Sequence, residues 1–572
     1  MYNETMKKSV LLFTVSLYAL GVWAAPAPGA DSLSLRERVG QTIMPRVVIG
    51  QQKAFKQAVL KGEVTGFFIK ANEGLVTHPE ITAKNQARFV AKQRKKLLKT
   101  IRDLNKWAAK SPHQIPLLLA IDYEGGTVTS PMYLGLKQMP SNMLLAASGD
   151  EKIVADAYAA QAREILLAGA NTALGPVTDV NSNPLNPIIQ TRSFGDDAAR
   201  VGRFSAAAVR ALENNGVPAF VKHFPGHGDT SVDSHYTQPV TDLPADKLWS
   251  AHISAFQPAV DAGVTGVMSA HVVYPALDKD NSAMFSTEIM QRLLRRKMGF
   301  KGLIATDGLD MGAVKGVTVE EIVRRAYGAG NNILLLSGDV RDVKTARTYP
   351  KRAADYVEGT LASARPEVSG EFILESAQKV LDLKERLGLF EDRAAVQDTG
   401  FDEASRRAAQ AGVTLVRDEQ RLIPLGADKQ TVCAVFFADD IFSLQLKAFT
   451  DELSARGKTV RSVFAPRTPG EKDALLARQC LSGADVLAVG TSRTSAMDAR
   501  QRQTVNSLLE SARKQGTPAV LVSLLNPYEI PLYPQARTVL ALYGPTVYTA
   551  QTAAQILLGD APAKGRLPVR LE

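Results

Sequence analysis

Short apolar runs alternate with longer stretches of helical hydrophobic periodicity from about residue 31 to residue 390. A typical helical stretch begins near Pro244, ends near Gly263 and repeats its apolar residues at three- and four-residue spacing. Eight strand-helix units predict a TIM-type (β/α)8 barrel. The eight predicted strands are Gln41 to Val48, Val64 to Lys70, Pro116 to Asp122, Asn171 to Val177, Val217 to Lys222, Val264 to Ser269, Gly302 to Asp307 and Asn332 to Ser337.

The apolar periodicity fades between Glu385 and Phe401, which places a domain boundary near residue 397. After it, apolar runs again alternate with helical patterns, as expected of a smaller α/β sandwich. The predicted organisation is therefore a barrel over residues 31–396 and a sandwich domain over residues 397–572. The runs predicted as strands of the second domain are Val432 to Phe437, Val486 to Val489, Ala519 to Leu525 and Thr538 to Leu542.

The first 24 residues have the pattern of a secretory signal peptide. Lys7 and Lys8 precede the apolar run Val10 to Val22, and cleavage is expected near Ala24. A single-pass anchor is the alternative, but the run is shorter than the ~20 residues that a membrane span requires. The sequence thus predicts a periplasmic or secreted protein with no stable membrane insertion after cleavage.

The chain carries 68 basic and 58 acidic residues, a formal net charge of +10. This surplus favours contact with anionic polymers such as nucleic acid, cell-wall polymers or membrane surfaces. The densest basic cluster, Lys92 to Lys106, has Leu97, Ile101 and Leu104 at helical spacing, so it predicts the solvated face of an amphipathic helix. No nucleic-acid motif surrounds it, and no nucleic-acid partner is predicted.

The two cysteines, Cys433 and Cys480, both lie in the predicted second domain. They do not form a metal-binding motif. In an oxidising compartment they could pair, but one candidate bridge in a chain of 572 residues leaves the question open.

The stretch from Lys222 to His235 concentrates chemically active residues. It holds three of the seven histidines, two carboxylates and a lysine within fourteen residues, interrupted by proline and glycine. Lys222 and His223 follow the apolar run that starts at Val217, which places them at the C-terminal end of a buried strand. Asp233 lies two residues before His235, where a carboxylate can orient the imidazole, so His235 is a candidate general acid and base.

This stretch has two alternative interpretations. His223, His227, His235 and Asp233 could form a zinc site, but the stretch has no HExxH pattern and no cysteine nearby, so no metal is predicted. A loop with only a structural role is the other alternative. Three histidines at the end of a strand argue against it, because packing alone does not require them.

Polar residues also follow four other predicted strands. The barrel rule that functional groups gather at the C-terminal ends of strands places them at one rim. These residues are Asp122, in the sequence Asp-Tyr-Glu-Gly-Gly; Asp179 and Asn181; His271; and Asp307.

The sequence KHFPGHGDTSVDSH resembles the signature of glycoside hydrolase family 3, in its NagZ-type β-N-acetylglucosaminidase branch. The likeness extends over nearly all of the chain after the first thirty or so residues. It implies that His235, paired with Asp233, is the acid/base, and that Lys222 and His223 hold sugar hydroxyls. It also implies that the second domain, which supplies a catalytic glutamate in other branches, has a structural or substrate-channel role here.

Two further segments resemble the same family. Residues 299–307 are similar to its nucleophile strand, so Asp307 is the candidate nucleophile of a retaining glycosidase. Asp310 is the nearest rival, and a helix-capping role for Asp307 is the other alternative. The loop at residues 186–195 is similar to the family's substrate-arginine loop, so Arg192 joins Asp122, Lys222 and His223 as predicted sugar-binding residues.

The predicted function is hydrolysis of terminal β-linked N-acetylglucosamine by an exported enzyme, with GlcNAc-containing glycans or muropeptides as substrates and no cofactor. A phosphorylase is an alternative, because an imidazole acid/base repels phosphate less than a second carboxylate would. A β-glucosidase or β-xylosidase of the same fold, and a non-catalytic cell-wall binding module, are the others. The oligomeric state stays open.

Overall fold

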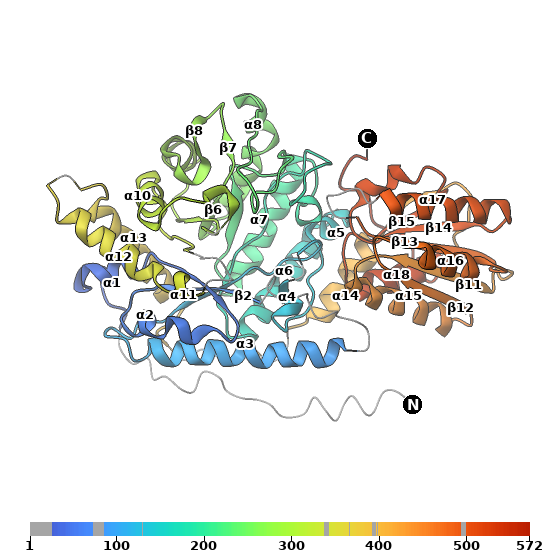
Figure 1. Cartoon of the computed structure of the whole chain (residues 1–572), viewed down its shortest axis with the longest axis horizontal. Helices are drawn as coiled ribbons and strands as arrows, with labels where there is room; N and C mark the ends of the chain where they lie inside the picture. The colour runs from blue at the N-terminus through green and yellow to red at the C-terminus, as the bar shows by residue number, and fades with distance from the viewer. Residues whose placement is uncertain are drawn as a thin grey trace.

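The computed structural model describes residues 26–571 except 72–84, 129, 310, 337–342, 365, 392–395, 397–398 and 494–498. The predicted signal peptide lies outside the described residues, and so does Asp310. Two units lie side by side, a barrel built by the first part of the chain and an α/β unit built by the last (Figure 1). None of the described helices is long and apolar enough to cross a membrane.

The barrel consists of parallel strands that pair in chain order. One sheet has the order β1-β2-β3-β4 and a second the order β5-β6-β9. Isolated bridges join the two sheets, from Ala173 to Ala219 and from Val177 to Lys222. The strands are β1 (Arg46–Val48), β2 (Gly66–Lys70), β3 (Leu118–Ile121), β4 (Thr172–Ala173), β5 (Phe220–Phe224), β6 (Gly266–Ser269) and β9 (Leu303–Thr306).

The barrel prediction is confirmed, but three of its strands differ from expectation, and the predicted strand Asn171 to Val177 shortens to the two residues of β4. In the predicted eighth strand, the described residues form only single bridges, from Ile333 to Ala305 and from Leu334 to Ile43. Here side chains replace part of the ladder, since Asn332 accepts from the Ile304 amide. The predicted first strand starts late, at Arg46, because the residues before it end helix α1 and Pro45 has no amide hydrogen to donate.

Alternation along the strands divides the barrel core into two layers. Leu119 and Ile121 of β3 pack outward with the helices, while Leu118 and Ala120 pack inside the barrel. The inward set also includes Phe220, Leu303 and Ala305. Asp122, Lys222 and Asp307 each lie two residues after one of these inward-facing residues. Their side chains therefore also face the inside of the barrel, beyond the end of the apolar core.

The helices of the barrel follow its strands. The predicted helix from Pro244 to Gly263 is interrupted at His252, whose backbone leaves the helical region at φ −131° and ψ −59°. It therefore becomes α8 (Ala245–Ala251), η4 (Ile253–Phe256) and α9 (Gln257–Asp261). The other helices are α1 (Leu35–Gly40), η2 (Gln52–Phe55), α2 (Lys56–Leu60), α3 (Gln86–Ala108), α4 (Ser130–Tyr133), α5 (Asn142–Ala147), α6 (Glu151–Leu167), η3 (Gln190–Arg192), α7 (Ala198–Asn214), the π-helix η6 (Glu288–Lys297), η7 (Gly312–Val314), α10 (Val319–Ala329), α11 (Val343–Ala346), α12 (Tyr349–Leu361) and α13 (Gly370–Arg386).

The second unit is a six-stranded sheet in the order β10-β15-β14-β13-β11-β12, parallel except for β10. The four predicted strands correspond to β11 (Thr431–Phe437), β13 (Val486–Thr491), β14 (Ala519–Ser523) and β15 (Thr538–Ala541). The two sheet edges, β10 (Thr414–Asp418) and β12 (Thr459–Ala465), were not predicted as strands. The helices are α14 (Phe401–Gly412), α15 (Ser443–Ala455), α16 (Glu471–Leu481), α17 (Ala499–Lys514), η9 (Pro527–Leu532) and α18 (Val547–Leu558), and they cover both faces (Figure 1).

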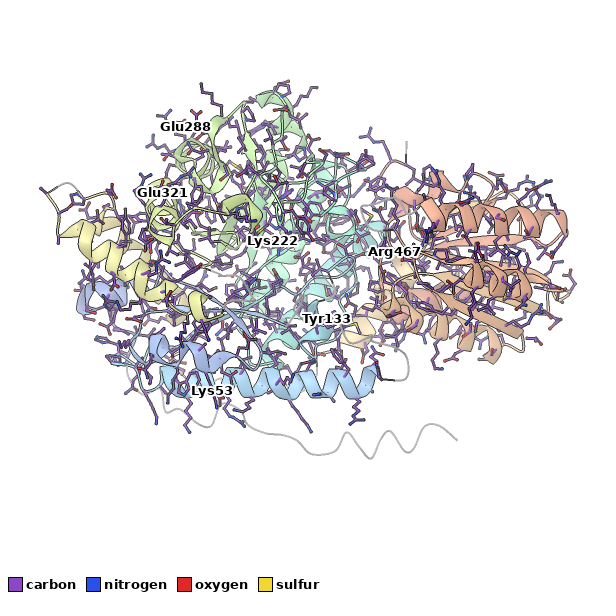
Figure 2. All side chains as sticks on the ribbon, viewed as in Figure 1. Lys53, Tyr133, Lys222, Glu288, Glu321 and Arg467 are labelled. Carbon is purple, nitrogen blue, oxygen red and sulfur yellow. A yellow bond between two sulfur atoms is a disulfide. The ribbon has the colours of Figure 1, made fainter. Side chains whose placement is uncertain are left out.

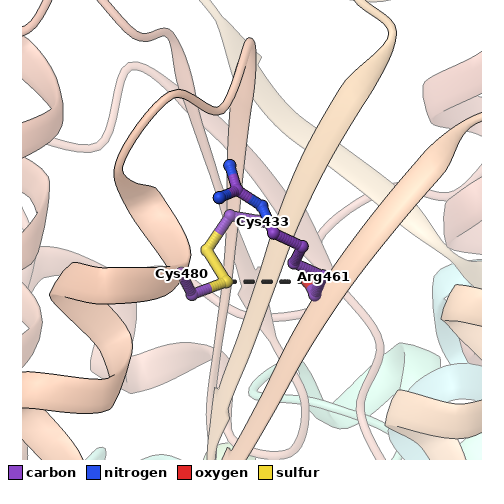
Figure 3. The surroundings of a disulfide bond; sticks show 3 residues. All are labelled: Cys433, Arg461 and Cys480. Carbon is purple, nitrogen blue, oxygen red and sulfur yellow. Dashed lines mark hydrogen bonds between the residues drawn. A yellow bond between two sulfur atoms is a disulfide. The ribbon is translucent and has the colours of Figure 1, made fainter.

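A disulfide joins Cys433 on β11 to Cys480 on α16 (Figure 3). The bond closes a sequence separation of 47 residues and fixes the helix against the sheet. The sulfur of Cys480 also lies 3.6 Å from the carbonyl oxygen of Arg461 on the neighbouring strand. The structure thus answers a question that the sequence left open.

The two units contact each other directly. Tyr528 places its hydroxyl 3.1 Å from the side-chain amide nitrogen of Asn181 in the barrel, and the Arg566 amide donates to the carbonyl of Ala147 at 2.9 Å. Helix α14 packs against α6 of the barrel and against α18 of the second unit. The boundary near residue 397 stays a prediction.

Candidate active site

A pocket of about 240 Å³ opens at the C-terminal ends of the barrel strands. All of its lining residues lie between Arg46 and Leu335, so the described residues of the second unit contribute none. The lining includes six of the seven residues predicted as site residues. The exception is Asp233, which contacts the lining residue His235. The six are Asp122, Arg192, Lys222, His223, His235 and Asp307.

Asp307 follows β9 directly and points into the pocket with 19% of its side chain exposed. One carboxylate oxygen accepts from the Gly308 amide at 2.7 Å, and the other lies 3.9 Å from Nε2 of His223. Burial alone would raise the pKa of Asp307, but the imidazoles of His223 and His271 outweigh it and hold the pKa below its ordinary value. Asp307 is thus a carboxylate at neutral pH, held in place and open to a ligand.

His235 reaches the pocket from the loop after β5. Its Nδ1 lies 2.7 Å from Oδ1 of Asp233, and the same oxygen accepts from the His235 amide at 2.9 Å. Burial would raise the pKa of Asp233, but hydrogen bonds from His235 outweigh it and lower the pKa. Because Asp233 occupies Nδ1, the other ring nitrogen, Nε2, is the one left to exchange a proton, and 55% of the side chain is exposed.

Five charged side chains form an alternating network at the inner wall of the pocket. Lys222 Nζ lies 2.7 Å from both Asp122 Oδ1 and Glu124 Oε1. Lys70 contacts the second oxygen of Asp122 at 2.9 Å. Arg192 donates to Glu124 through Nε at 2.7 Å and through Nη2 at 3.0 Å. Each carboxylate therefore lies between two cations, in a geometry that fixes Lys222 and Arg192 before any ligand arrives. Lys222 lies deep inside the barrel (Figure 2).

The network is strongly buried, and its charges depend on each other. Burial raises the pKa of Glu124, but Arg192 and Lys222 outweigh it and lower that pKa to about 2. The pKa of Asp122 is lowered as well, against the effect of burial, by Lys222 and Lys70. Burial lowers the pKa of Lys222, and the two carboxylates more than restore it. Asp122 and Glu124 are therefore carboxylates at neutral pH, and Lys222 is an ammonium group.

A second carboxylate, Asp179, holds the histidine loop. It is fully buried, and its Oδ2 lies 2.7 Å from Nδ1 of His223. It also accepts from the amides of His223 and His227, at 3.2 and 2.6 Å. Burial raises the pKa of Asp179, but His223 outweighs it and lowers that pKa to about 2. Asp179 thus aims Nε2 of His223 at the pocket and at Asp307.

His227 also lines the pocket, but both of its ring nitrogens contact hydroxyl groups of the protein. Its Nδ1 lies 2.9 Å from the hydroxyl of Thr230, and its Nε2 lies 3.0 Å from that of Ser234. Burial, followed by the nearby His223, lowers its pKa to about 4, so it is neutral. Within the described residues, no three His, Cys, Asp or Glu side chains converge in a way that could hold a metal ion.

Two glycines allow the close contacts that shape the pocket walls. A Cβ at Gly228 would lie 1.8 Å from the carbonyl oxygen of Val180, so only glycine fits where the histidine loop crosses the segment after β4. Gly126, with φ +70°, forms the turn after Glu124, and a Cβ there would meet Thr191 at 2.3 Å. The chain therefore turns tightly at this point beside the pocket.

Three residues of the site, Glu124, Asp179 and Lys70, were not among the predicted site residues. Glu124 stands within the quoted Asp-Tyr-Glu-Gly-Gly segment, and its two-residue spacing from Asp122 was the available signal. Asp179 was placed at the rim without a function. Lys70 was predicted only to end a strand. All three act on other site residues across the barrel, which local spacing does not reveal.

Comparison with known proteins gives consistent matches. The model of the glycosyl hydrolase family 3 N-terminal domain matches residues 34–383. The β-hexosaminidase A of Pseudoalteromonas piscicida is 30% identical over 521 residues, which cover 81% of this chain and 84% of that protein. A β-N-acetylglucosaminidase/β-glucosidase of Cellulomonas fimi is 27% identical over 499 residues, covering 80% and 84%. The solved family 3 β-N-acetylglucosaminidase of Paenibacillus sp. str. FPU-7 superposes with a TM-score of 0.79 at 26% identity, covering 94% of this chain and 99% of that one.

Proposed function

Because this chain belongs to glycosyl hydrolase family 3, we propose that it is a retaining β-N-acetylhexosaminidase that removes terminal β-linked N-acetylglucosamine. The observation that carries the proposal is the convergence of Asp307 and His235 on one pocket with a preformed network of fixed charges. The names of the relatives from Pseudoalteromonas, Cellulomonas and Paenibacillus support the choice of sugar.

The proposed mechanism is a double displacement. The Asp307 carboxylate attacks the anomeric carbon, the glycosidic C–O bond breaks, and the imidazolium of His235 gives its proton to the leaving oxygen. Water then loses a proton to the neutral His235 and attacks the anomeric carbon, which releases the sugar and regenerates the carboxylate. The 2.7 Å contact from Asp233 supports this role, because it stabilises the protonated imidazole and orients it.

The charge network supports recognition of one terminal sugar. The pocket, at about 240 Å³, is slightly smaller than the roughly 300–1,000 Å³ of sites for drug-sized ligands. Asp122, Lys222 and Arg192 line its wall with fixed acceptors and donors for hydroxyl groups. His223, aimed by Asp179, adds a donor or acceptor next to Asp307. The tight pocket favours release of single sugars from a chain end over cleavage within a chain.

Phosphorolysis is the second candidate for the reaction. The pocket places an imidazole, and no carboxylate among its lining residues besides Asp122 and Asp307, where an incoming phosphate would approach. One fewer negative charge lowers the repulsion of that anion. Whether water or phosphate accepts the sugar is therefore an explicit part of the test.

Export and a peptidoglycan-derived substrate complete the proposal. The N-terminal pattern of Lys7, Lys8 and the following apolar run supports export. The disulfide between Cys433 and Cys480 also supports it, because such bonds persist in oxidising compartments. In the envelope, cell-wall fragments are the abundant source of β-linked N-acetylglucosamine, and muropeptides are the substrate we propose.

The test is release of the aryl group from a chromogenic β-N-acetylglucosaminide, assayed beside the matching β-glucoside and β-xyloside, with and without phosphate. Asp307→Ala should abolish release, and His235→Ala should slow it most for poor leaving groups, which need the proton. Asp196→Asn, at a carboxylate outside the pocket, is the matched control.

Each arm separates one alternative. Release that depends on phosphate and yields a sugar 1-phosphate would replace hydrolysis by phosphorolysis. Preference for the glucoside or xyloside would change the substrate. Undiminished release by Asp307→Ala would refute the nucleophile, and no release from any glycoside by the parent would favour a binding protein.

A further inference from the structure

The exposed side of α3 carries a straight row of cations, which we call the basic ridge. At 100° per residue, its six members fall within an arc of about 80° and span about 27 Å along the helix. The buried residues Leu97, Ile101, Leu104 and Ala108 lie on the opposite side and fix this side outward. The basic ridge consists of Arg88, Lys92, Lys95, Lys99, Arg102 and Lys106, all exposed.

The ridge lies in the one part of the chain that holds the whole positive surplus. Residues 46–110 contain 15 basic and four acidic residues, a net charge of +11, against +10 for the entire chain. The rest of the chain therefore sums to about zero. Nine of these 15 basic residues are the exposed cations of the ridge and of the neighbouring segment Lys53 to Lys61, whereas Arg46 and Lys70 line the pocket.

Few acidic groups neutralise the ridge. Asp103 pairs with Lys99 at 2.7 Å and also accepts from Gln52 at 2.8 Å. Glu63 is buried and pairs with Arg36, away from α3. Among the described residues, the other five ridge cations make no ion pair within 4.0 Å. Within the part of the chain that the structure describes, the ridge thus presents several cations to solvent without an ion pair.

The patch is two elements wide. Helix α2 and the short η2 pack beside α3 and add the exposed Lys56 and Lys53. The exposed Lys61 follows directly after α2. In Figure 1, α3 runs along one edge of the barrel with α2 beside it, and Lys53 lies at that same edge in Figure 2. None of the large apolar residues exposed on the described surface belongs to these three elements.

We propose that the basic ridge, with the lysines of η2 and α2, is a docking surface for an anionic phospholipid bilayer. A broad cationic patch without apolar anchors matches the negative surface of a membrane, to which each lysine or arginine near the headgroups adds attraction. Without an inserted side chain the contact is peripheral and reversible. A linear polyanion can bind along a single row of cations, whereas a bilayer surface contacts a patch that is wide in both directions. The lysines beside α3 widen the patch and therefore favour the bilayer.

Docking would leave the pocket available. None of the residues that line the pocket comes from η2, α2 or α3. The protein would therefore act on soluble glycans while held at the membrane surface. This inference does not depend on the reaction that the pocket catalyses, so it can fail or succeed independently of the proposed function.

The test is flotation of the signal-less protein with vesicles of phosphatidylcholine alone or with 30% phosphatidylglycerol. We expect binding only to the anionic vesicles, with loss at high salt, because the Debye length falls from about 8 Å at 0.15 M to about 3 Å at 1 M. A fourfold ridge variant should bind at least tenfold more weakly and keep its activity on a soluble glycoside. It carries Lys92→Gln, Lys95→Gln, Arg102→Gln and Lys106→Gln.

The matched control removes the same charge from other surfaces and should bind within about twofold of the parent. It carries Lys247→Gln, Lys279→Gln, Lys301→Gln and Lys472→Gln, at exposed positions. An equal loss in both variants would overturn the ridge as a specific surface. Absence of parent binding to anionic vesicles would overturn the membrane, and retention on heparin in that case would point to a polyanion.

Discussion

Replacing Glu124 by Gln removes one charge from the centre of the buried network and changes almost nothing in volume. The carboxylate accepts from Arg192 twice and contacts Lys222 at 2.7 Å. An amide keeps one acceptor oxygen but turns an NH2 group toward one of the two cations. In the variant, one buried cation therefore loses its carboxylate partner. An unpaired buried charge strongly lowers the free energy of unfolding.

The structure gives the size of the effect. Lowering the pKa of Glu124 from its ordinary 4.5 to about 2 stabilises the folded state by about 3 kcal/mol at neutral pH. Loss of one partner of a buried pair costs roughly 3–5 kcal/mol, which agrees. Because the folded pKa is lowered, this stabilisation is present above pH 4.5 and disappears as the pH falls toward 2. The difference in the free energy of unfolding between parent and variant should therefore decrease as the pH falls from 4.5 toward 2.

The tryptophans make the assay specific to the barrel. Besides Trp23 in the predicted signal peptide, the chain has only Trp107 and Trp249, both in barrel helices. Urea unfolding of the signal-less protein followed by tryptophan fluorescence thus reports the barrel alone. At pH 7 we expect Glu124→Gln to lower the urea midpoint by an amount corresponding to about 3 kcal/mol. We also expect a lower kcat/KM, since Lys222 and Arg192 lose their fixed positions.

The matched control is Glu288→Gln, which breaks an exposed pair with Arg292 on η6 of the barrel. Exposed pairs contribute little, so its midpoint should stay near that of the parent. If Glu124→Gln costs no more than this control, or if its cost is the same at pH 3 as at pH 7, the buried network does not stabilise the barrel as argued.

Three further outcomes are expected. Asp233→Asn should lower kcat on the order of 10²-fold with little change in KM, because His235 loses the charge that orients it, and a better leaving group should recover part of the rate in steady-state assays. Replacing both Cys433 and Cys480 by Ala should destabilise the second unit by about 2–4 kcal/mol, seen by calorimetry, with the tryptophan transition of the barrel less affected. Gly228→Ala should prevent correct folding of the site, seen as loss of activity and a lower melting temperature.

Controls make these outcomes decisive. Gly359→Ala, in α12, meets nothing within 4 Å and should be neutral or stabilising; equal damage by both glycine variants would refute the steric argument. Asp242→Asn, at an exposed carboxylate, should leave kcat unchanged. An unchanged calorimetric transition after removal of both cysteines would show that the disulfide does not stabilise the second unit.

The local pattern of the chain was enough to predict the barrel, because buried parallel strands are continuous apolar runs and each of them is followed by a helical period. It also placed Lys222, His223 and Asp307 at strand ends, and paired Asp233 with His235, since two-residue spacing is a local property. The pattern failed where side chains replaced backbone pairing, as at Asn332, and at the edge strands β10 and β12, whose exposed positions weaken the apolar signal.

The order of residues along the strands is sufficient to predict which groups reach one rim. How those groups pair their charges depends on the closed barrel. Glu124 lies between Arg192 and Lys222, which are 68 and 98 positions away in the sequence, and Asp179 aims His223 from another strand end. The pairing of the two cysteines was decided in the same way. Such partners come into contact because the barrel closes and because the helix packs on the sheet. The spacing of residues along the chain does not predict which distant residues the fold brings together.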